Sequence, residues 1–370
     1  MKVNTVLSSD IGSMPATAEP RVIEAGAQRS GTLLPLLNVG VEEYRCFRDA
    51  VVSGYADKAR VGVDVPNYPQ FRDMNEMFFQ LMRGIEKVEG GLMAVGSIRP
   101  AQGASIPEVD VIRRESVKAR ELSGRDKLRL RVCVTWPYTL ASFFGARTPG
   151  LYRMLGRALA GILDESMFRS RYAEVAHVCV DEPVLGFMND PMLDYGSDGR
   201  EALRAAWDDV CRTASSRGVD TSMHLHNTSE TLVWDVEHLD AVGSHVGDPM
   251  YTSESTRQLI EEKDKHVWAT LGVTQFDSLI QMHHQAEGYT GEMPEKIGET
   301  WTGIKKGAID PYIFLEDKGT MEKRLAKIIE FFGGERVAYA SPECGLNSFP
   351  SYGVALECLR RSVAAVESVG

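Results

Sequence analysis

The sequence lacks long apolar runs, and this absence excludes membrane-spanning proteins. No window of its 370 residues approaches the roughly 20 consecutive apolar residues that a transmembrane helix needs. The first segment, MKVNTVLSSDIGSMP, has no uninterrupted apolar stretch of the kind found in signal peptides. We therefore expect a cytoplasmic protein without a membrane partner.

Paired cysteines and an excess of basic charge are also missing. The six cysteines show no paired spacing, which in a reducing compartment is typical of free thiols. The 41 Lys and Arg residues stand against 52 Asp and Glu residues, and the net charge of −11 is spread along the chain. This balance provides no basic surface for phosphate groups, so we do not expect a nucleic acid partner.

Strand-like and helix-like segments do alternate along the chain. No linker, repeat or low-complexity segment marks a boundary, so we expect one domain over residues 1–370. About eight alternations predict an α/β fold, a (β/α)8 TIM barrel, with a doubly wound open sheet as the alternative. Amphipathic helices that end at glycine are predicted over 200–218 and 320–334. The predicted strands lie within 3–12, 61–66, 91–98, 128–136, 174–183, 219–227, 239–248, 266–273 and 336–345.

Residues 274–307 depart from this alternation. They form a polar connection that is longer than the usual αβ loop of about 2 to 6 residues. We interpret this segment as an inserted connection that serves as a lid or as an oligomer contact.

Two histidines and a cysteine stand at predicted strand ends. His224 and His226 are two residues apart, so they point to the same side of a strand, and Cys344 follows another strand. Because strand ends of a barrel meet at one rim, the three side chains predict a zinc site with an open position. His245 and Asp248 follow a neighbouring strand, and either could supply a fourth ligand or bond to a ligand. The alternative is that these residues bind no metal. One histidine would then cap the next helix, the other would form a hydrogen bond to a neighbouring strand, and Cys344 would be a buried free thiol.

Acidic residues stand near the same predicted rim. Asp181 ends an apolar strand, and Asp73 and Glu76 lie three residues apart on one face of a helix or turn. Carboxylates directed into a barrel mouth would hold a substrate ammonium group by charge-assisted hydrogen bonds. Surface salt bridges are the alternative.

Taken together and in order, these motifs resemble the cobalamin-independent methionine synthase family, specifically its C-terminal catalytic barrel. The resemblance covers nearly the whole chain and rests on six segments: DIGSMP, PQFRDMNEMF, VTWPYTL, VDEPVL, HLHN and SPECGL. It implies a zinc ion that binds the thiol of homocysteine and presents it as a thiolate to a methyl donor, which agrees with the metal site expected from the residues.

The resemblance also implies roles for single residues. His224 and Cys344 fall on metal ligands of the family. Ser13, with the backbone of Ile11 and Gly12, falls on the contact to the substrate carboxylate. Glu76 and Asp181 fall on the acidic residues that hold the substrate amino group, and Asp181 is also a predicted catalytic residue.

The sequence departs from the family pattern at several of these positions. His226 replaces a cysteine ligand and His245 a glutamate ligand, so three histidines and one cysteine would bind a metal that need not be zinc. Tyr312, our second predicted catalytic residue, stands where the family has its catalytic histidine. Phe143 replaces a tryptophan of the folate face, and the chain has room for a single barrel. These differences favour a methylcorrinoid on a protein partner, or a simple folate, as methyl donor over a polyglutamyl folate.

We expect a methyltransferase whose small-molecule substrate is a thiol amino acid, most simply homocysteine, and whose product is methionine. Two alternatives remain open at this point. The first is alkyl transfer to another thiol such as coenzyme M, whose sulfonate would favour basic residues in the pocket. The second is a non-catalytic relative that binds a metal or a corrinoid.

Overall fold

The computed structural model describes residues 6–30, 41–187 and 189–369. Its strands are β1 (Leu7–Ser8), β2 (Met82–Val88), β3 (Gly91–Pro100), β4 (Leu128–Thr135), β5 (Ala173–Glu182), β6 (Asp220–Leu225), β7 (Ala241–Gly243), β8 (His266–Thr270) and β9 (Val337–Ser341). Its α-helices are α1 (Pro20–Arg29), α2 (Val41–Arg60), α3 (Glu76–Phe79), α4 (Pro107–Arg114), α5 (Ser116–Ser123), α6 (Pro137–Ala141), α7 (Pro149–Ser166), α8 (Asp198–Ser215), α9 (Glu254–Glu262), α10 (Phe276–Ala286), α11 (Met293–Lys305), α12 (Lys318–Phe332) and α13 (Tyr352–Val369). No helix of the described residues is long and apolar enough to cross a bilayer.

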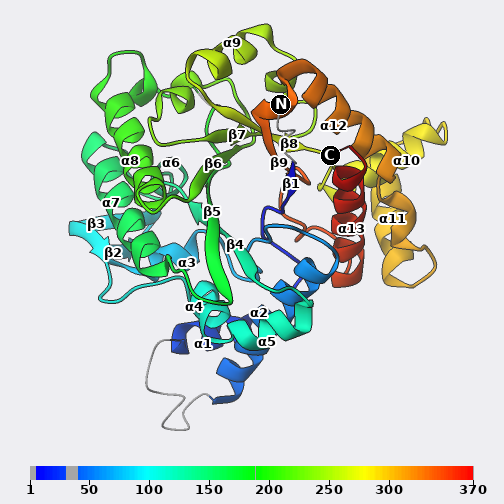
Figure 1. The fold of residues 1–370 in the computed structure, drawn as a ribbon, viewed down its shortest axis with the longest axis horizontal. Helices are drawn as coiled ribbons and strands as arrows, with labels where there is room; N and C mark the ends of the chain where they lie inside the picture. The colour runs from blue at the N-terminus through cyan, green and yellow to red at the C-terminus, as the bar shows by residue number, and fades with distance from the viewer. Residues whose placement is uncertain (1–5, 31–40, 188, 370) are drawn as a thin grey trace.

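Seven strands form one parallel sheet in the order β1, β9, β8, β7, β6, β5, β4. The sheet curls around a common centre, and most of the helices lie outside it (Figure 1). Parallel strands that are each followed by a helical segment place all of their carboxyl ends at one rim. The alternation predicted from the sequence is therefore confirmed as a barrel-like α/β fold with a seven-stranded sheet.

The gap between β1 and β4 is bridged by an extended segment rather than by a regular strand. Val65 forms a parallel bridge with Ser9, and Asn67 forms one with Arg131. The prediction of a strand over 61–66 is therefore wrong in detail, because only isolated residues pair where an eighth strand would lie. A closed eight-stranded barrel is not formed by the described residues.

Two further predictions differ from the structure. The predicted strand over 91–98 belongs to β3, which pairs with β2 in an antiparallel hairpin outside the barrel sheet. Gly90 and Gly91 both have positive φ angles and allow the tight turn between these strands. The polar connection 274–307 is not a loop, because it folds into α10 and α11, which lie side by side at the edge of the molecule (Figure 1).

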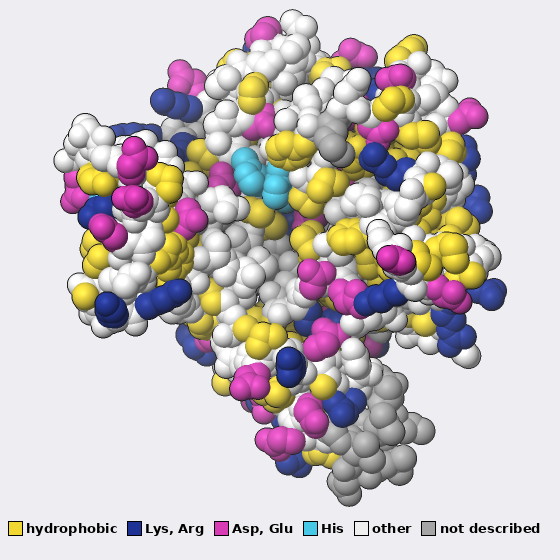
Figure 2. Space-filling view, turned by 180° about the vertical axis from the view of Figure 1, so that it is seen from behind, with side chains coloured by type: hydrophobic (Ala, Val, Ile, Leu, Met, Phe, Trp, Pro, Cys, Tyr) yellow, Lys and Arg dark blue, Asp and Glu magenta, His cyan; other side chains and the backbone are white. Residues whose placement is uncertain are grey.

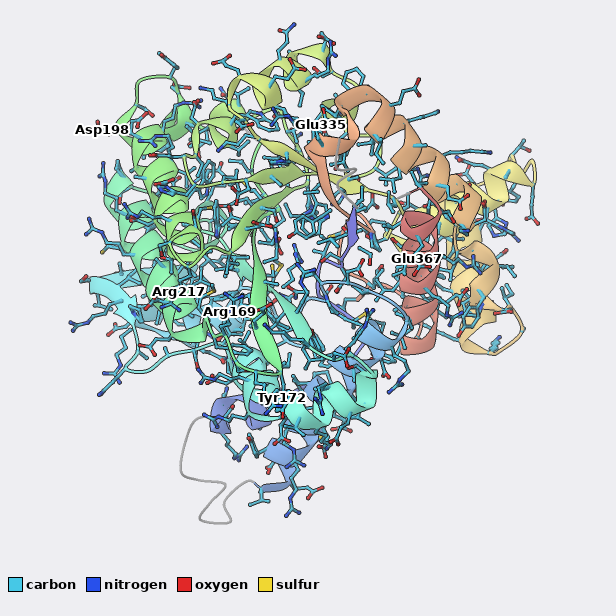
Figure 3. All side chains as sticks on the ribbon, viewed as in Figure 1. Arg169, Tyr172, Asp198, Arg217, Glu335 and Glu367 are labelled. Carbon is cyan, nitrogen blue, oxygen red and sulfur yellow. The ribbon has the colours of Figure 1, made fainter. Side chains whose placement is uncertain are left out.

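Helices α7 and α8 show why the local sequence folds as it does. Thr148 caps α7 by accepting a hydrogen bond from the N–H of Leu151, and Pro149 starts the helix. Ser197 caps α8 in the same way, and this helix and α12 confirm the two amphipathic helices predicted from periodicity. Gly156 permits close packing, because a Cβ there would lie 2.6 Å from the Cβ of Ala206. Side chains fill the space inside the ribbon, so the barrel is a packed core (Figure 3).

Candidate metal centre

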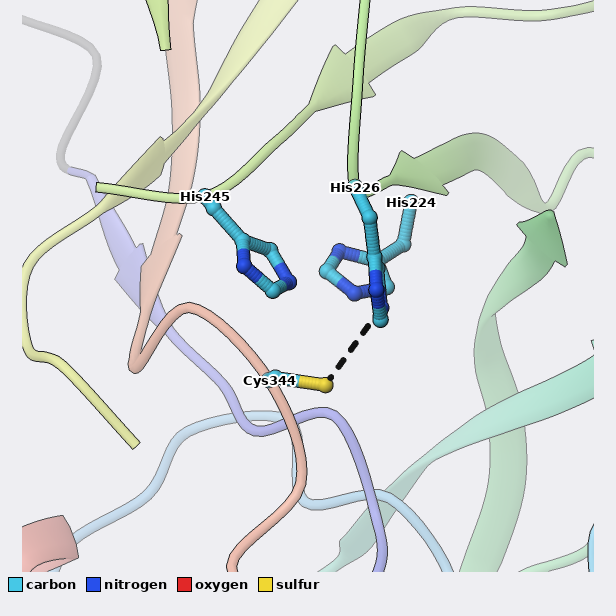
Figure 4. A group of neighbouring side chains, drawn as sticks. All are labelled: His224, His226, His245 and Cys344. Carbon is cyan, nitrogen blue, oxygen red and sulfur yellow. Dashed lines mark hydrogen bonds between the residues drawn. The ribbon is translucent and has the colours of Figure 1, made fainter. Parts of the chain in front are cut away.

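Three imidazoles and one thiol converge at the carboxyl ends of β6, β7 and β9. His224 lies on β6, His226 follows it, His245 follows β7 and Cys344 follows β9. Their ligand atoms all lie within 4.8 Å of one another, and the Cys344 Sγ is 3.6 Å from the His226 Nε2 (Figure 4). Histidine side chains are visible in a hollow of the molecular surface (Figure 2). The structure thus brings together the three predicted ligands and adds His245.

Burial favours the neutral form of the three histidines, which is the form in which imidazole binds a metal. It lowers the pKa of His224 well below its usual value, helped by His226 and His245, and lowers the pKa of His226 to about 4. The pKa of His245 is also lowered by burial, against the opposing charges of Glu343 and Asp248. The His224 and His245 Nε2 atoms are buried and have no hydrogen-bond partner among the described residues. Buried nitrogens without partners are costly, and a bound cation would satisfy them.

Zinc binding is expected to release about one proton per ion near pH 7. The histidines are already neutral there, whereas burial raises the pKa of the Cys344 thiol to about 12, so only the thiol has a proton to lose. Calorimetric titrations in buffers of different ionisation enthalpy measure this number. The apparent affinity should rise with pH by about tenfold per unit, and a titration that releases no proton would exclude Cys344 as a ligand.

The structure distinguishes between the two candidates for a fourth ligand. His245 joins the cluster, and its ring centroid lies 4.1 Å from that of His226. Asp248 instead organises the loop, because its carboxylate accepts hydrogen bonds from Thr228 Oγ1, Ser244 Oγ and the N–H of Met250. His245 is therefore the fourth candidate ligand, and Asp248 supports the loop that carries it.

Glu343 connects three loops at the rim of the barrel, two of which carry candidate metal ligands. Its buried carboxylate accepts hydrogen bonds from the N–H of Val246 and the N–H of Thr274, both at 2.9 Å. These contacts join the segment after β9, where Cys344 lies, to the segments after β7 and β8. The sequence analysis did not single out this residue, although an acid next to a candidate ligand is a usable signal.

Replacing Glu343 by glutamine is expected to lower zinc affinity about tenfold without unfolding the protein. Glutamine keeps one acceptor oxygen but turns an amide NH2 group toward one of the two N–H donors. One of the two hydrogen bonds that connect the loops is therefore lost. A competitive zinc titration measures the effect. Glu108→Gln provides the matched control, because Glu108 is equally buried but pairs with Arg72 instead. Equal zinc affinities of the two variants would contradict this role of Glu343.

The segment predicted to contact a substrate carboxylate lies beside the metal ligands. The N–H of Leu346 donates to the carbonyl of Ser13 at 2.8 Å, and a Cβ on Gly345 would collide with the Ser13 side chain. The loop containing Ile11, Gly12 and Ser13 is therefore next to the Cys344 loop. Gly12 has a φ of 128°, so another residue would be strained there.

Asp181 lies inside the barrel on the strand next to His224. It pairs with His224 in the register of β5 and β6, and its side chain is buried. The thiols of Cys133 and Cys179 donate to its carboxylate at 2.6 and 3.6 Å. Burial raises the pKa of Asp181, and the nearby Arg131 partly offsets this shift. No cationic side chain of the described residues forms an ion pair with Asp181, so an anionic Asp181 would be available to a cationic ligand group.

The other two predicted site residues, Glu76 and Tyr312, are more exposed than the candidate metal ligands and Asp181. Glu76 begins α3, its side chain is 44% exposed, and it pairs with Lys87 at 3.2 Å. The Thr135 Oγ1 donates to the carbonyl of Met74, which places this segment over the end of β4. Tyr312 lies on a short 3-10 helix, Pro311–Phe314, is 41% exposed, and has its hydroxyl beside Gly353. Among the described residues no hydrogen bond joins Tyr312 to the metal ligands.

A cavity of about 590 Å³ opens beside two of the ligands. His226 and His245 form one part of its wall, and Trp234 and Met250 form apolar parts. Most of the other lining side chains are serines and threonines, and no Lys or Arg is among the described residues that line it. The space suits a small molecule that reaches the ligands without a strongly anionic group.

Comparisons with known proteins agree on the architecture. No model of a known protein family matches the sequence, and no curated protein does. A B12-independent methionine synthase from Shewanella sp. W3-18-1, solved with selenomethionine, matches with a TM-score of 0.63 and 15% identity over 99% of this chain and 98% of that chain. A candidate vitamin-B12-independent methionine synthase from Listeria monocytogenes matches with a TM-score of 0.56 and 15% identity over 99% of both chains. The chain therefore has the fold of the B12-independent methionine synthases.

Proposed function

We propose that this protein is a metal-dependent methyltransferase that methylates the thiol of homocysteine to give methionine. The observation that carries the proposal is a cluster of four candidate metal ligands next to the loop 11–13, which the sequence resemblance assigns to the substrate carboxylate. The ligand atoms of His224, His226, His245 and Cys344 lie within 4.8 Å of one another, and the loop around Ser13 adjoins Cys344. The similar fold of the Shewanella protein, which was solved with selenomethionine, supports this choice of substrate.

The donor set fits zinc. Neutral imidazole and thiolate are the ligands that zinc prefers, and the two unpartnered histidine nitrogens are where a cation would be satisfied. When bound, zinc would supply the chemistry of a lowered thiol pKa, which makes the substrate sulfur a nucleophile. The residues of the chain would hold and orient the amino acid, with Asp181 bonded to its ammonium group and the loop 11–13 bonded to its carboxylate. Tyr312 has no role in this proposal, because it is exposed and away from the described ligand contacts.

The charges of the pocket favour homocysteine over coenzyme M. No Lys or Arg lines the cavity beside His226 and His245 among the described residues, so a sulfonate in that cavity would have no cationic side chain as a partner. Asp181, which is buried beside His224, would repel a sulfonate and attract an ammonium group. The charge pattern therefore supports an amino-acid thiol.

The proposal is tested by incubating the zinc-loaded protein with homocysteine and either methylcobalamin or methyltetrahydrofolate, and measuring methionine by mass spectrometry. The methyl group forms a bond to sulfur as its bond to the donor breaks. With methylcobalamin the donor departs as cob(I)alamin and the thiol proton is released to solvent, whereas with methyltetrahydrofolate N5 takes up a proton as tetrahydrofolate leaves, so no net proton is released. Methionine formed with one donor, and lost after chelation of the metal, is the expected result. Zinc binding without methionine from either donor would favour the non-catalytic, metal-binding alternative.

A further inference from the structure

Two buried cations hold the backbone of the predicted carboxylate-binding loop. Arg131 Nη1 donates to the carbonyls of Asp10 and Ile11 at 2.6 and 3.1 Å. Lys58 Nζ donates to the carbonyl of Gly12 at 2.9 Å and forms an ion pair with the Asp10 carboxylate at 2.6 Å. Three successive carbonyl groups are therefore fixed by two positively charged side chains.

Both cations lie in the interior, and one of them has spare hydrogen-bonding capacity. Arg131 and Lys58 have no exposed surface. Lys58 is neutralised by Asp10, whereas Arg131 has no ion pair within 4.0 Å among the described residues. The Arg131 Nε and Nη2 atoms also lack hydrogen-bond partners, and its guanidinium lies 5.0 Å from the ring of Trp268. Asp10 and Asp181 offset part of the Arg131 charge from a distance, but no carboxylate of the described residues pairs with the guanidinium directly.

The direction of these carbonyls determines where the neighbouring N–H groups point. In a trans peptide the C=O and N–H groups point in opposite directions, and the described chain has no cis peptide. The N–H groups of Ile11, Gly12 and Ser13 consequently point away from Arg131 and Lys58. None of the three donates to an acceptor among the described residues. Successive N–H groups on one side of a loop that have no protein acceptor are available to an anion.

We propose that Arg131 and Lys58 are positioning residues that turn the N–H groups of residues 11–13 toward the substrate and so create its carboxylate site. This inference rests on the proposed function, and it adds two residues that do not touch the substrate. Arg131 acts through the peptide groups that it holds, and its charge favours an anion in front of them. Asp181 supplies the opposite charge nearby, so the pocket selects an α-amino acid rather than a simple thiol.

The inference is tested by calorimetry with the purified protein and two ligands, L-methionine and 3-(methylthio)propylamine. The amine retains the thioether and the ammonium group but lacks the carboxylate. Wild-type protein should bind L-methionine at least about tenfold more tightly than the amine. Arg131→Met should remove most of this preference while leaving the affinity for the amine within about twofold. A purely structural role would weaken both ligands to the same degree.

Two further variants keep the test decisive. Arg129→Met is the matched control, because Arg129 lies two residues earlier on β4, near the amino end of the strand, where it pairs with Glu174 of β5, and should leave the preference unchanged. Arg131→Lys keeps the charge and should restore part of the preference if Arg131→Met folds poorly. Wild-type protein that binds both ligands equally would overturn the inference but leave the proposed function in place. Wild-type protein that binds neither ligand would overturn the proposed function itself.

Discussion

Replacing Cys344 by alanine is expected to lower zinc affinity by more than about a hundredfold. Zinc binding to four-ligand protein sites is worth about 10 to 16 kcal/mol, or about 2.5 to 4 kcal/mol per ligand. The loss should be at the high end for Cys344, because it is the only candidate ligand that becomes an anion, whereas His224, His226 and His245 bind as neutral imidazoles. Competitive titration against a chelator, with elemental analysis of the purified variant, measures the change.

The number of protons released on zinc binding distinguishes the role of Cys344 from that of the histidines. His224→Ala should also bind zinc weakly, but it should still release about one proton per ion, because the thiol remains. Cys344→Ala should release none. Cys46→Ala is the matched control, because Cys46 is a partly buried free thiol outside the cluster. Wild-type zinc affinity in the Cys344 variant would contradict a metal site at this position.

The candidate metal ligands were predictable from the sequence only in part. Strand alternation places His224 and His226 on one side of β6. Cys344 lies near them because the carboxyl ends of the parallel strands meet at one rim of the barrel. The local sequence pattern did not decide between His245 and Asp248, because the choice depends on the path of the loop after β7, although the family resemblance pointed to His245. That path is fixed in part by a hydrogen bond that the hydroxyl of Thr228, 20 residues earlier in the chain, donates to the Asp248 carboxylate.

The errors in the strands predicted from the sequence have a common physical origin. A β-branched run has the same pattern whether it forms a barrel strand, an isolated bridge such as that of Val65, or a hairpin outside the barrel such as β3. Only tertiary neighbours distinguish these cases. Arg131 and Lys58 escaped notice for a related reason, because their partners are backbone carbonyls, which leave no mark in the sequence.

The second large effect is expected for Asp181→Asn, which should weaken binding of L-methionine about a hundredfold, or about 3 kcal/mol. Asp181 is buried, so its charge would interact with a substrate ammonium group with little screening by water. Asparagine has the same shape but removes this charge. Calorimetric titration with L-methionine measures the loss, and zinc content should remain that of the wild type.

Asp181→Asn should weaken ligand binding but should not lower the stability of the folded protein. Burial raises the pKa of Asp181, so an ionised carboxylate costs free energy in the empty pocket, and this cost is present above the folded-state pKa. Above that pKa, Asp181→Asn removes the cost, so the variant should unfold at a temperature equal to or above that of the wild type. A residue that weakens stability while strengthening ligand binding is what a binding role predicts.

Glu76→Gln provides the comparison that decides which carboxylate holds the ammonium group. Glu76 is 44% exposed and already pairs with Lys87, so its charge is screened and partly compensated. We expect its replacement to weaken L-methionine binding by less than about fivefold. Equal losses in the two variants would show that both carboxylates contact the amino group, as the sequence resemblance implies. A loss confined to Glu76→Gln would move the ammonium site from the barrel interior to its rim, because Asp181 would then have no part in binding.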